Sequence, residues 1–141
     1  MRTLSRWFIK TSFIYFILAL LVGVLLGVQA TWGFPTPAVP IYPTYLHLMA
    51  EGWITMLIIG VAIWMFPKFS QEKPRGIEGL GWASYLLLNT GLLLRIISEP
   101  IIGSDDSRAT FWAAILILAA LLQWLGGIAF VFNAWGRVKV K

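Results

Sequence analysis

The chain of 141 residues has no cysteine and only one histidine. Without cysteine it cannot form a disulfide, a thiolate metal site or an iron–sulfur cluster of its own. Charged residues are also scarce, at 12% of the chain, about half of what a soluble domain carries. Hydrophobic residues make up 59%. No Ser-His-Asp set, phosphate-binding loop or paired-carboxylate motif is evident, which argues against hydrolysis and phosphoryl transfer. The composition indicates an integral membrane protein.

Four apolar stretches approach or exceed the roughly 20 residues that a helix needs to cross a bilayer. They cover about residues 8–28, 46–66, 80–98 and 110–134. Pro67 and Pro100 follow the second and third stretches, and we expect them to end those helices. Short connections predict antiparallel neighbours. The sequence therefore predicts a single all-α transmembrane domain, a four-helix bundle. The first stretch resembles a signal peptide with a cleavage site near residue 30, but its near-spanning length predicts a retained helix.

The basic residues indicate an orientation. Nine of the 11 Lys and Arg residues precede the first stretch, lie in the loop after the second or end the chain: Arg2, Arg6, Lys10, Lys68, Lys73, Arg75, Arg137, Lys139 and Lys141. Such an excess marks the cytoplasmic side of a membrane protein. We therefore expect cytoplasmic termini and a multi-pass location in the inner (cytoplasmic) membrane. The same placement accounts for the net charge of +5 through contact with the lipid bilayer, without a nucleic-acid partner.

Four ionisable residues lie in the second and third stretches: His47, Glu51, Arg95 and Glu99. Intramembrane ionisable residues are costly and are functional candidates by default. His47 and Glu51 are four residues apart and share a helix face, and so do Arg95 and Glu99. With the predicted orientation, all four lie in the outer leaflet at similar depth. We expect Glu51 to pair with Arg95, because a pair is cheaper in hydrocarbon than either charge alone.

Each of these residues has a structural and a functional interpretation. His47 is either an interfacial histidine bonded to a loop carbonyl or a ligand for heme or another metal. His47 and Glu51 could form half of a metal site, although two ligands are not enough. Arg95 either completes a structural ion pair with Glu51 or neutralises an anion such as a heme propionate. Trp53 and Trp124 are candidates to wall a flat macrocycle.

Three amides in the predicted helices are interpreted as structural. Asn89 and Gln123 are expected to hydrogen-bond between helices. Asn133 is expected to cap the last helix.

The stretch from His47 through Gly52-Trp53 and Gly60 to Phe66-Pro67 resembles the heme-bearing helix of the heme-copper oxidase subunit I superfamily. It is most similar to the C-type oxidases, nitric-oxide reductases and NnrS-type proteins. The segments 89–95 and 121–135 look like later helices of that group. The resemblance implies a b-type heme near the outer leaflet with His47 as its iron ligand. We expect Glu51, Gly52, Trp53 and Arg95 to line this site, with Arg95 opposite the propionates.

The chain departs from this family in size and in histidine content. The catalytic members have many more helices and several metal-binding histidines, whereas a single histidine cannot build a binuclear centre. We therefore expect a minimal four-helix member that is not an enzyme on its own. Its expected role is electron transfer, or the handling of heme, O2 or NO. If iron has a second histidine ligand, it comes from a homodimer mate or a larger membrane complex. The redox partner would be a quinone or a cytochrome.

Two other functions fit the sequence. In the first, the chain is a non-catalytic accessory subunit of a respiratory or photosynthetic complex, without a cofactor of its own. In the second, a quinone or lipid pocket lies near His47 and Glu51.

Overall fold

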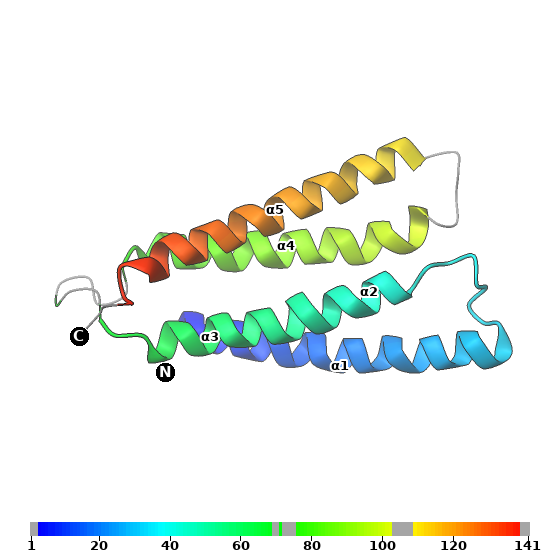
Figure 1. Ribbon diagram of the computed structural model, residues 1–141, viewed down its shortest axis with the longest axis horizontal. Helices are drawn as coiled ribbons and strands as arrows, with labels where there is room; N and C mark the ends of the chain where they lie inside the picture. The colour runs from blue at the N-terminus through cyan, green and yellow to red at the C-terminus, as the bar shows by residue number, and fades with distance from the viewer. Residues whose placement is uncertain (1–2, 69–70, 72–75, 103–108, 139–141) are drawn as a thin grey trace.

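The computed structural model describes residues 3–68, 71, 76–102 and 109–138, and every regular element in this part of the chain is a helix. The elements shown in Figure 1 are α1 (Thr3–Trp32), α2 (Tyr42–His47), the π-helix η1 (Leu48–Thr55), α3 (Met56–Met65), α4 (Glu78–Ile102) and α5 (Ala109–Trp135). The segments α2, η1 and α3 follow one another directly and form one continuous span, Tyr42–Met65.

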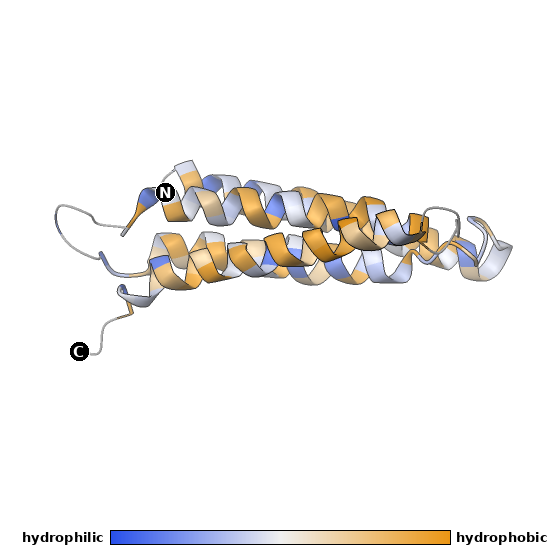
Figure 2. Ribbon diagram, turned by 90° about the horizontal axis from the view of Figure 1, so that it is seen from above, coloured by the Kyte–Doolittle hydropathy of each residue, from blue (hydrophilic) through white to orange (hydrophobic). Residues whose placement is uncertain are grey.

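The four predicted spans are confirmed as helices long and apolar enough to cross a membrane. The observed helices mostly extend a few residues beyond the predicted stretches, because a helix continues into the polar interface after its apolar run ends. The chain is therefore a multi-pass membrane protein. Large apolar side chains such as Ile17, Ile117 and Phe132 are exposed on the protein surface, where lipid would cover them. Figure 2 shows that hydrophobic residues recur along the length of the helices.

The two prolines expected to end helices behave differently. The second span ends at Met65, and Phe66 adopts an extended conformation with ψ of 144°, as favoured for a residue that precedes proline. The expectation for Pro100 is wrong, because α4 continues through it to Ile102. Pro100 lies in the last turn of α4, where few hydrogen bonds remain for the proline to interrupt.

The helices form two antiparallel hairpins. In the first, α1 packs against η1 and α3, and in the second, α4 packs against α5. The hairpins meet through α4, which contacts α2, η1 and α1. The first turn of α1 and the last turn of α5 lie at one end of the molecule, called the terminus end below (Figure 1). The opposite end, where α1 finishes at Trp32 and α2 begins at Tyr42, is called the loop end.

Small residues allow the close packing of the second hairpin. A Cβ atom added to Gly91 of α4 would lie 2.7 Å from Cγ of Gln123 and 2.8 Å from the carbonyl oxygen of Ala119, both on α5. Glycine at membrane helix contacts lets two backbones approach in this way. The central core is narrow, and Phe8, Leu48, Met56 and Leu92 are its largest fully buried apolar side chains.

Candidate functional site: a histidine, arginine and glutamate cluster

His47, the candidate metal ligand from the sequence, lies in a polar cluster toward the loop end. Thr44 and His47 from α2 meet Arg95 and Glu99 from α4, and these four residues are called the His47 cluster. Nη1 of Arg95 lies 2.9 Å from Nε2 of His47 and 3.5 Å from Oε1 of Glu99. Nδ1 of His47 lies 3.1 Å from the same Glu99 oxygen. Thr44 donates a long hydrogen bond of 3.5 Å to Oε2 of Glu99.

These contacts define the tautomer of His47. A guanidinium only donates hydrogen bonds, so Nε2 must accept the one from Arg95. Nδ1 then carries the proton, and its N–H donates a hydrogen bond to the carbonyl oxygen of Pro43, 2.8 Å away, and points toward Glu99. The imidazole is therefore neutral. Its lone pair lies on Nε2 and its N–H is held by a backbone carbonyl and a carboxylate.

The cluster is partly withdrawn from solvent. The side-chain exposure is 8% for Glu99, 17% for Arg95 and 32% for His47. Two charges are expensive in such a place unless they are paired and hydrogen-bonded. Arg95 and Glu99 carry opposite charges and His47 is neutral, so these three residues can lie near hydrocarbon without a net charge.

Helix geometry positions each member of the cluster. Arg95 and Glu99 are one turn apart on α4, and Thr44 and His47 are one turn apart on α2. Directly after His47 the backbone widens into the π-helix η1, in which Oγ1 of Thr55 donates to the carbonyl oxygen of Ala50, 2.9 Å away. π-helical turns are rare and frequently occur at functional sites. No feature of the sequence predicted this turn.

The expected pairing of Glu51 with Arg95 is not observed. Among the described residues, Arg95 forms its ion pair with Glu99, its neighbour on α4. Oε1 of Glu51 is buried without a hydrogen-bond partner in the described part of the chain, and the same holds for Nε of Arg95. Glu99 prevails because it lies on the same helix face as Arg95, whereas Glu51 is one turn deeper on another span. The two unpartnered atoms show that this region has unused hydrogen-bonding capacity.

The structure does not bring Gly52 and Trp53 to the His47 cluster. The ring of Trp53 lies 4.1 Å from that of Phe16 on α1, measured between centroids. A Cβ atom added to Gly52 would lie 2.7 Å from Cβ of Tyr15 and 3.1 Å from Cδ2 of Leu92. Gly52 therefore lies at a close approach of α1, η1 and α4. Its role is packing.

A hydrogen-bonded network joins α1 to α4 deeper in the molecule. The Tyr15 hydroxyl donates to Oδ1 of Asn89 at 2.8 Å, and Nδ2 of Asn89 donates to the Tyr85 carbonyl oxygen. The hydroxyls of Thr11 and Tyr85 lie 2.7 Å apart. The predicted interhelical role of Asn89 is confirmed. In contrast, Nε2 of Gln123 is buried without a partner in the described part of the chain.

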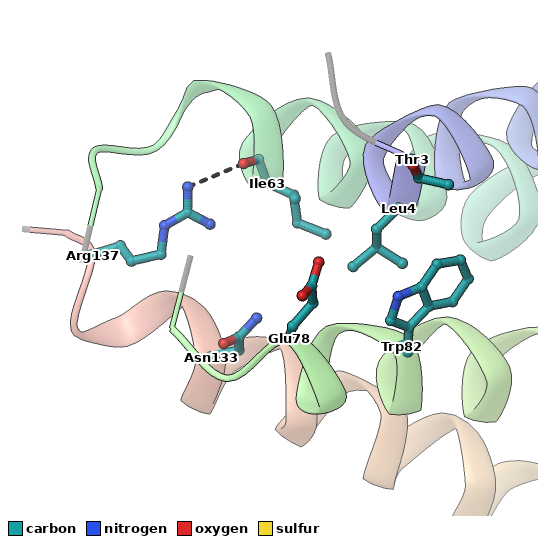
Figure 3. A pocket seen from close by; sticks show the side chains of 7 residues that line it. All are labelled: Thr3, Leu4, Ile63, Glu78, Trp82, Asn133 and Arg137. Carbon is teal, nitrogen blue, oxygen red and sulfur yellow. Dashed lines mark hydrogen bonds between the residues drawn. The ribbon is translucent and has the colours of Figure 1, made fainter. Parts of the chain in front are cut away.

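The terminus end has a polar arrangement of its own. Arg137 is almost fully buried and donates hydrogen bonds to the carbonyl oxygens of Ile63 in α3 and of Phe66 and Pro67 just after it. Figure 3 shows the hydrogen bond to Ile63. Oδ1 of Asn133 accepts a hydrogen bond from the backbone N–H of Ile77, just before α4. The expected capping role of Asn133 thus serves the beginning of α4 and not its own helix.

A cavity of about 60 Å³ lies beside Asn133 and Arg137, and the Glu78 side chain projects into it (Figure 3). The other residues that line it are Thr3, Leu4, Ile63 and Trp82. Each water molecule takes about 30 Å³ in the liquid. The cavity therefore has room for a couple of waters and is far too small for a macrocycle.

The side chains among the described residues limit the kinds of metal site that the protein can form. Within them, no three side chains of His, Cys, Asp or Glu gather in a way that could hold a metal ion. A lone histidine suits a metal whose other ligands come from a porphyrin. Metal-binding histidines commonly donate their second N–H to a carboxylate or carbonyl, and Nδ1 of His47 does so. Nε2 of His47 could bind a metal only if Arg95 withdrew from it.

Comparison with protein-family models, with curated proteins and with solved structures found no match to this chain.

Proposed function

We propose that this protein binds heme b in the membrane, with Nε2 of His47 as the iron ligand. The observation that carries the proposal is the state of Nδ1, which donates to the Pro43 carbonyl and toward Glu99. These hydrogen bonds at Nδ1 hold the imidazole ring in place and leave the lone pair on Nε2, the nitrogen that would bind iron. The family resemblance of the His47 to Pro67 segment supports the same assignment.

Arg95 has a second role in the proposal. Its Nη1 must leave Nε2 before iron can bind, and its Nε is buried without a partner in the described part of the chain. A heme propionate is an anion that a guanidinium recognises well. Arg95 would therefore move from His47 to a propionate when heme enters. Glu51, with an oxygen that is unpartnered in the described part of the chain, would lie one turn deeper than His47.

A bound heme would supply one-electron redox chemistry or a site for a diatomic gas such as O2 or NO. The protein's part is to hold and orient the iron through His47 and to balance the propionate charge through Arg95. We infer no catalysis by one chain alone. A second His47 from a homodimer mate, or a ligand from a larger complex, would complete six-coordinate iron, and a quinone or cytochrome would exchange electrons with it. In this proposal the termini are cytoplasmic, the membrane is the inner membrane and the site is on its outer side.

An absorption spectrum tests the proposal directly. Protein purified from heme-replete cells is expected to show a Soret band that is lost in His47→Ala. Gln123→Leu, which removes a polar side chain from the other hairpin, is the matched control and should keep the band. Protein without a Soret band, or a band that survives in His47→Ala, would contradict heme binding through His47.

Two observations favour a second candidate function. Both ring nitrogens of His47 already have partners within the chain, as expected for a structural histidine. In addition, α5 packs on α4 and leaves large apolar side chains exposed, among them Ile117, Trp124 and Phe132. An accessory subunit of a larger respiratory or photosynthetic complex would have both features. It would purify without a cofactor and together with larger subunits.

A further inference from the structure

The first three turns of α1 form a basic hollow at the terminus end. The hollow encloses about 250 Å³ and is lined by Thr3, Arg6, Trp7 and Lys10. Two of these residues are cations, one has a hydroxyl and none is acidic. Arg6 and Lys10 are one helical turn apart and therefore lie on the same face. Within the described residues neither cation forms an ion pair with a carboxylate.

The same face of α1 continues as an apolar stripe toward the loop end. At spacings of three or four residues from Lys10 it presents large exposed side chains, namely Phe13, Ile14, Ile17, Leu21 and Val24. The rise of 1.5 Å per residue gives this stripe, from Phe13 to Val24, a length of about 17 Å. One leaflet of a bilayer has a hydrocarbon thickness of about 15 Å. The stripe is therefore long enough to lie against an acyl chain along its full length.

We propose that this face of α1 is a binding site for one anionic phospholipid. The phosphodiester would lie between Arg6 and Lys10, and Thr3 would donate a hydrogen bond to it. The acyl chain would follow the stripe from Phe13 to Val24. Trp7, half exposed beside the cations, lies where an amphipathic ring contacts the glycerol region.

Charge complementarity selects an anionic lipid over a zwitterionic one. Two cations that form no ion pair within the described residues converge with a hydroxyl on one hollow. A phosphodiester that has no compensating amine therefore balances their charge best. A choline headgroup would bring its own positive charge to the same place. Each Lys or Arg near an anionic lipid surface strengthens binding roughly fivefold. This site is independent of heme, because His47 lies in the second span toward the opposite end.

Lipid retention measured by native mass spectrometry tests the proposal. The protein is released from nanodiscs of phosphatidylcholine that contain a minor fraction of phosphatidylglycerol. The wild type should retain phosphatidylglycerol in preference to phosphatidylcholine. Arg6→Gln with Lys10→Gln should lower this preference roughly 25-fold, at about fivefold for each cation. Each single variant should lower it about fivefold, which provides a readout if the double variant folds poorly.

Two control variants separate a defined site from general surface charge. Arg6→Lys with Lys10→Arg keeps both charges and should keep the preference. Lys68→Gln with Lys73→Gln removes two cations from the loop between α3 and α4 and should also keep it. An equal loss in the loop variant would overturn the proposal, and so would a wild type that retains both lipids alike. Competition by glycerol 3-phosphate at concentrations similar to those of the lipid would overturn the assignment to a phospholipid, since the ligand would then be a free phosphate ester.

Discussion

Nη1 of Arg95 lies 2.9 Å from Nε2 of His47, so the nitrogen that would bind a metal accepts a hydrogen bond from the chain itself. The same guanidinium forms an ion pair with Glu99, whose side chain is only 8% exposed. Arg95 thus connects the only histidine of the chain to the buried carboxylate of the cluster. Any ligand that takes Nε2 has to displace this arginine while leaving Glu99 neutralised.

We predict that Arg95→Met lowers the free energy of unfolding by about 3 kcal/mol, because it leaves the buried Glu99 without its cation. Adding Glu99→Gln should recover part of this loss, since the unpaired charge is then gone. Unfolding in mixed detergent micelles, followed by circular dichroism, gives both values. Losses in the double variant that equal the sum of the two single losses would show that the two residues are not coupled.

Gly52→Ala should be more destabilising than the addition of a single methyl group suggests. The added Cβ would lie 2.7 Å from Cβ of Tyr15, an atom that cannot move without its backbone, so α1 and η1 must separate. Overpacking of this kind costs about 1–3 kcal/mol. The matched control is Gly27→Ala in α1, where no atom lies within 4 Å of the new Cβ, and its melting temperature should not fall. Equal melting temperatures for the two variants would contradict the close approach at Gly52.

Tyr15→Phe should weaken the contact between the two hairpins by about 1 kcal/mol, because it removes the hydrogen bond to Asn89. A double-mutant cycle with Asn89→Leu isolates this interaction from the other contacts of both residues. Tyr42→Phe, at an exposed position in the first turn of α2, is the control and should leave stability unchanged. A coupling energy near zero in the cycle would count against the Tyr15–Asn89 hydrogen bond.

Arg137→Lys should destabilise the terminus end although it preserves the charge. The guanidinium donates to the carbonyl oxygens of Ile63, Phe66 and Pro67 at 2.8–3.0 Å, and an ammonium cannot reproduce this forked geometry. The loss should be about 1–3 kcal/mol, as expected when buried acceptors lose their donor. Faster amide hydrogen exchange confined to the last turn of α3 would locate the effect. Unchanged exchange there would contradict the role assigned to Arg137.

Much of the fold could be predicted because a membrane imposes simple rules. Each span is an apolar run of the required length, and the sequence predicts all four. Pro67 ends its helix because Phe66 before it becomes extended, whereas Pro100 stands in a last turn that has few hydrogen bonds to lose. The same residue type therefore leads to opposite outcomes, and only the position within the helix separates them.

The candidate site was predictable only in part. Helix periodicity places His47, Arg95 and Glu99 correctly toward one end, but it cannot rank Glu51 against Glu99 as the partner of Arg95. A carbonyl partner for His47 was one of the alternatives that the sequence left open, but side-chain patterns could not identify it as the Pro43 carbonyl, which accepts the hydrogen bond from Nδ1. The π-helical turn after His47 depends on how α1 and α4 pack around it. Such features arise from tertiary contacts, which periodicity within one helix does not encode.

The packing of α5 on α4 has a consequence for how the sequence can change over time. Every residue of the His47 cluster and of the Tyr15–Asn89 network lies in the first three spans. Substitutions along the outward face of α5 are therefore not constrained by either. That helix can adapt to a new neighbour in the bilayer, or be refitted to a different assembly, while the polar interior of the protein stays as it is.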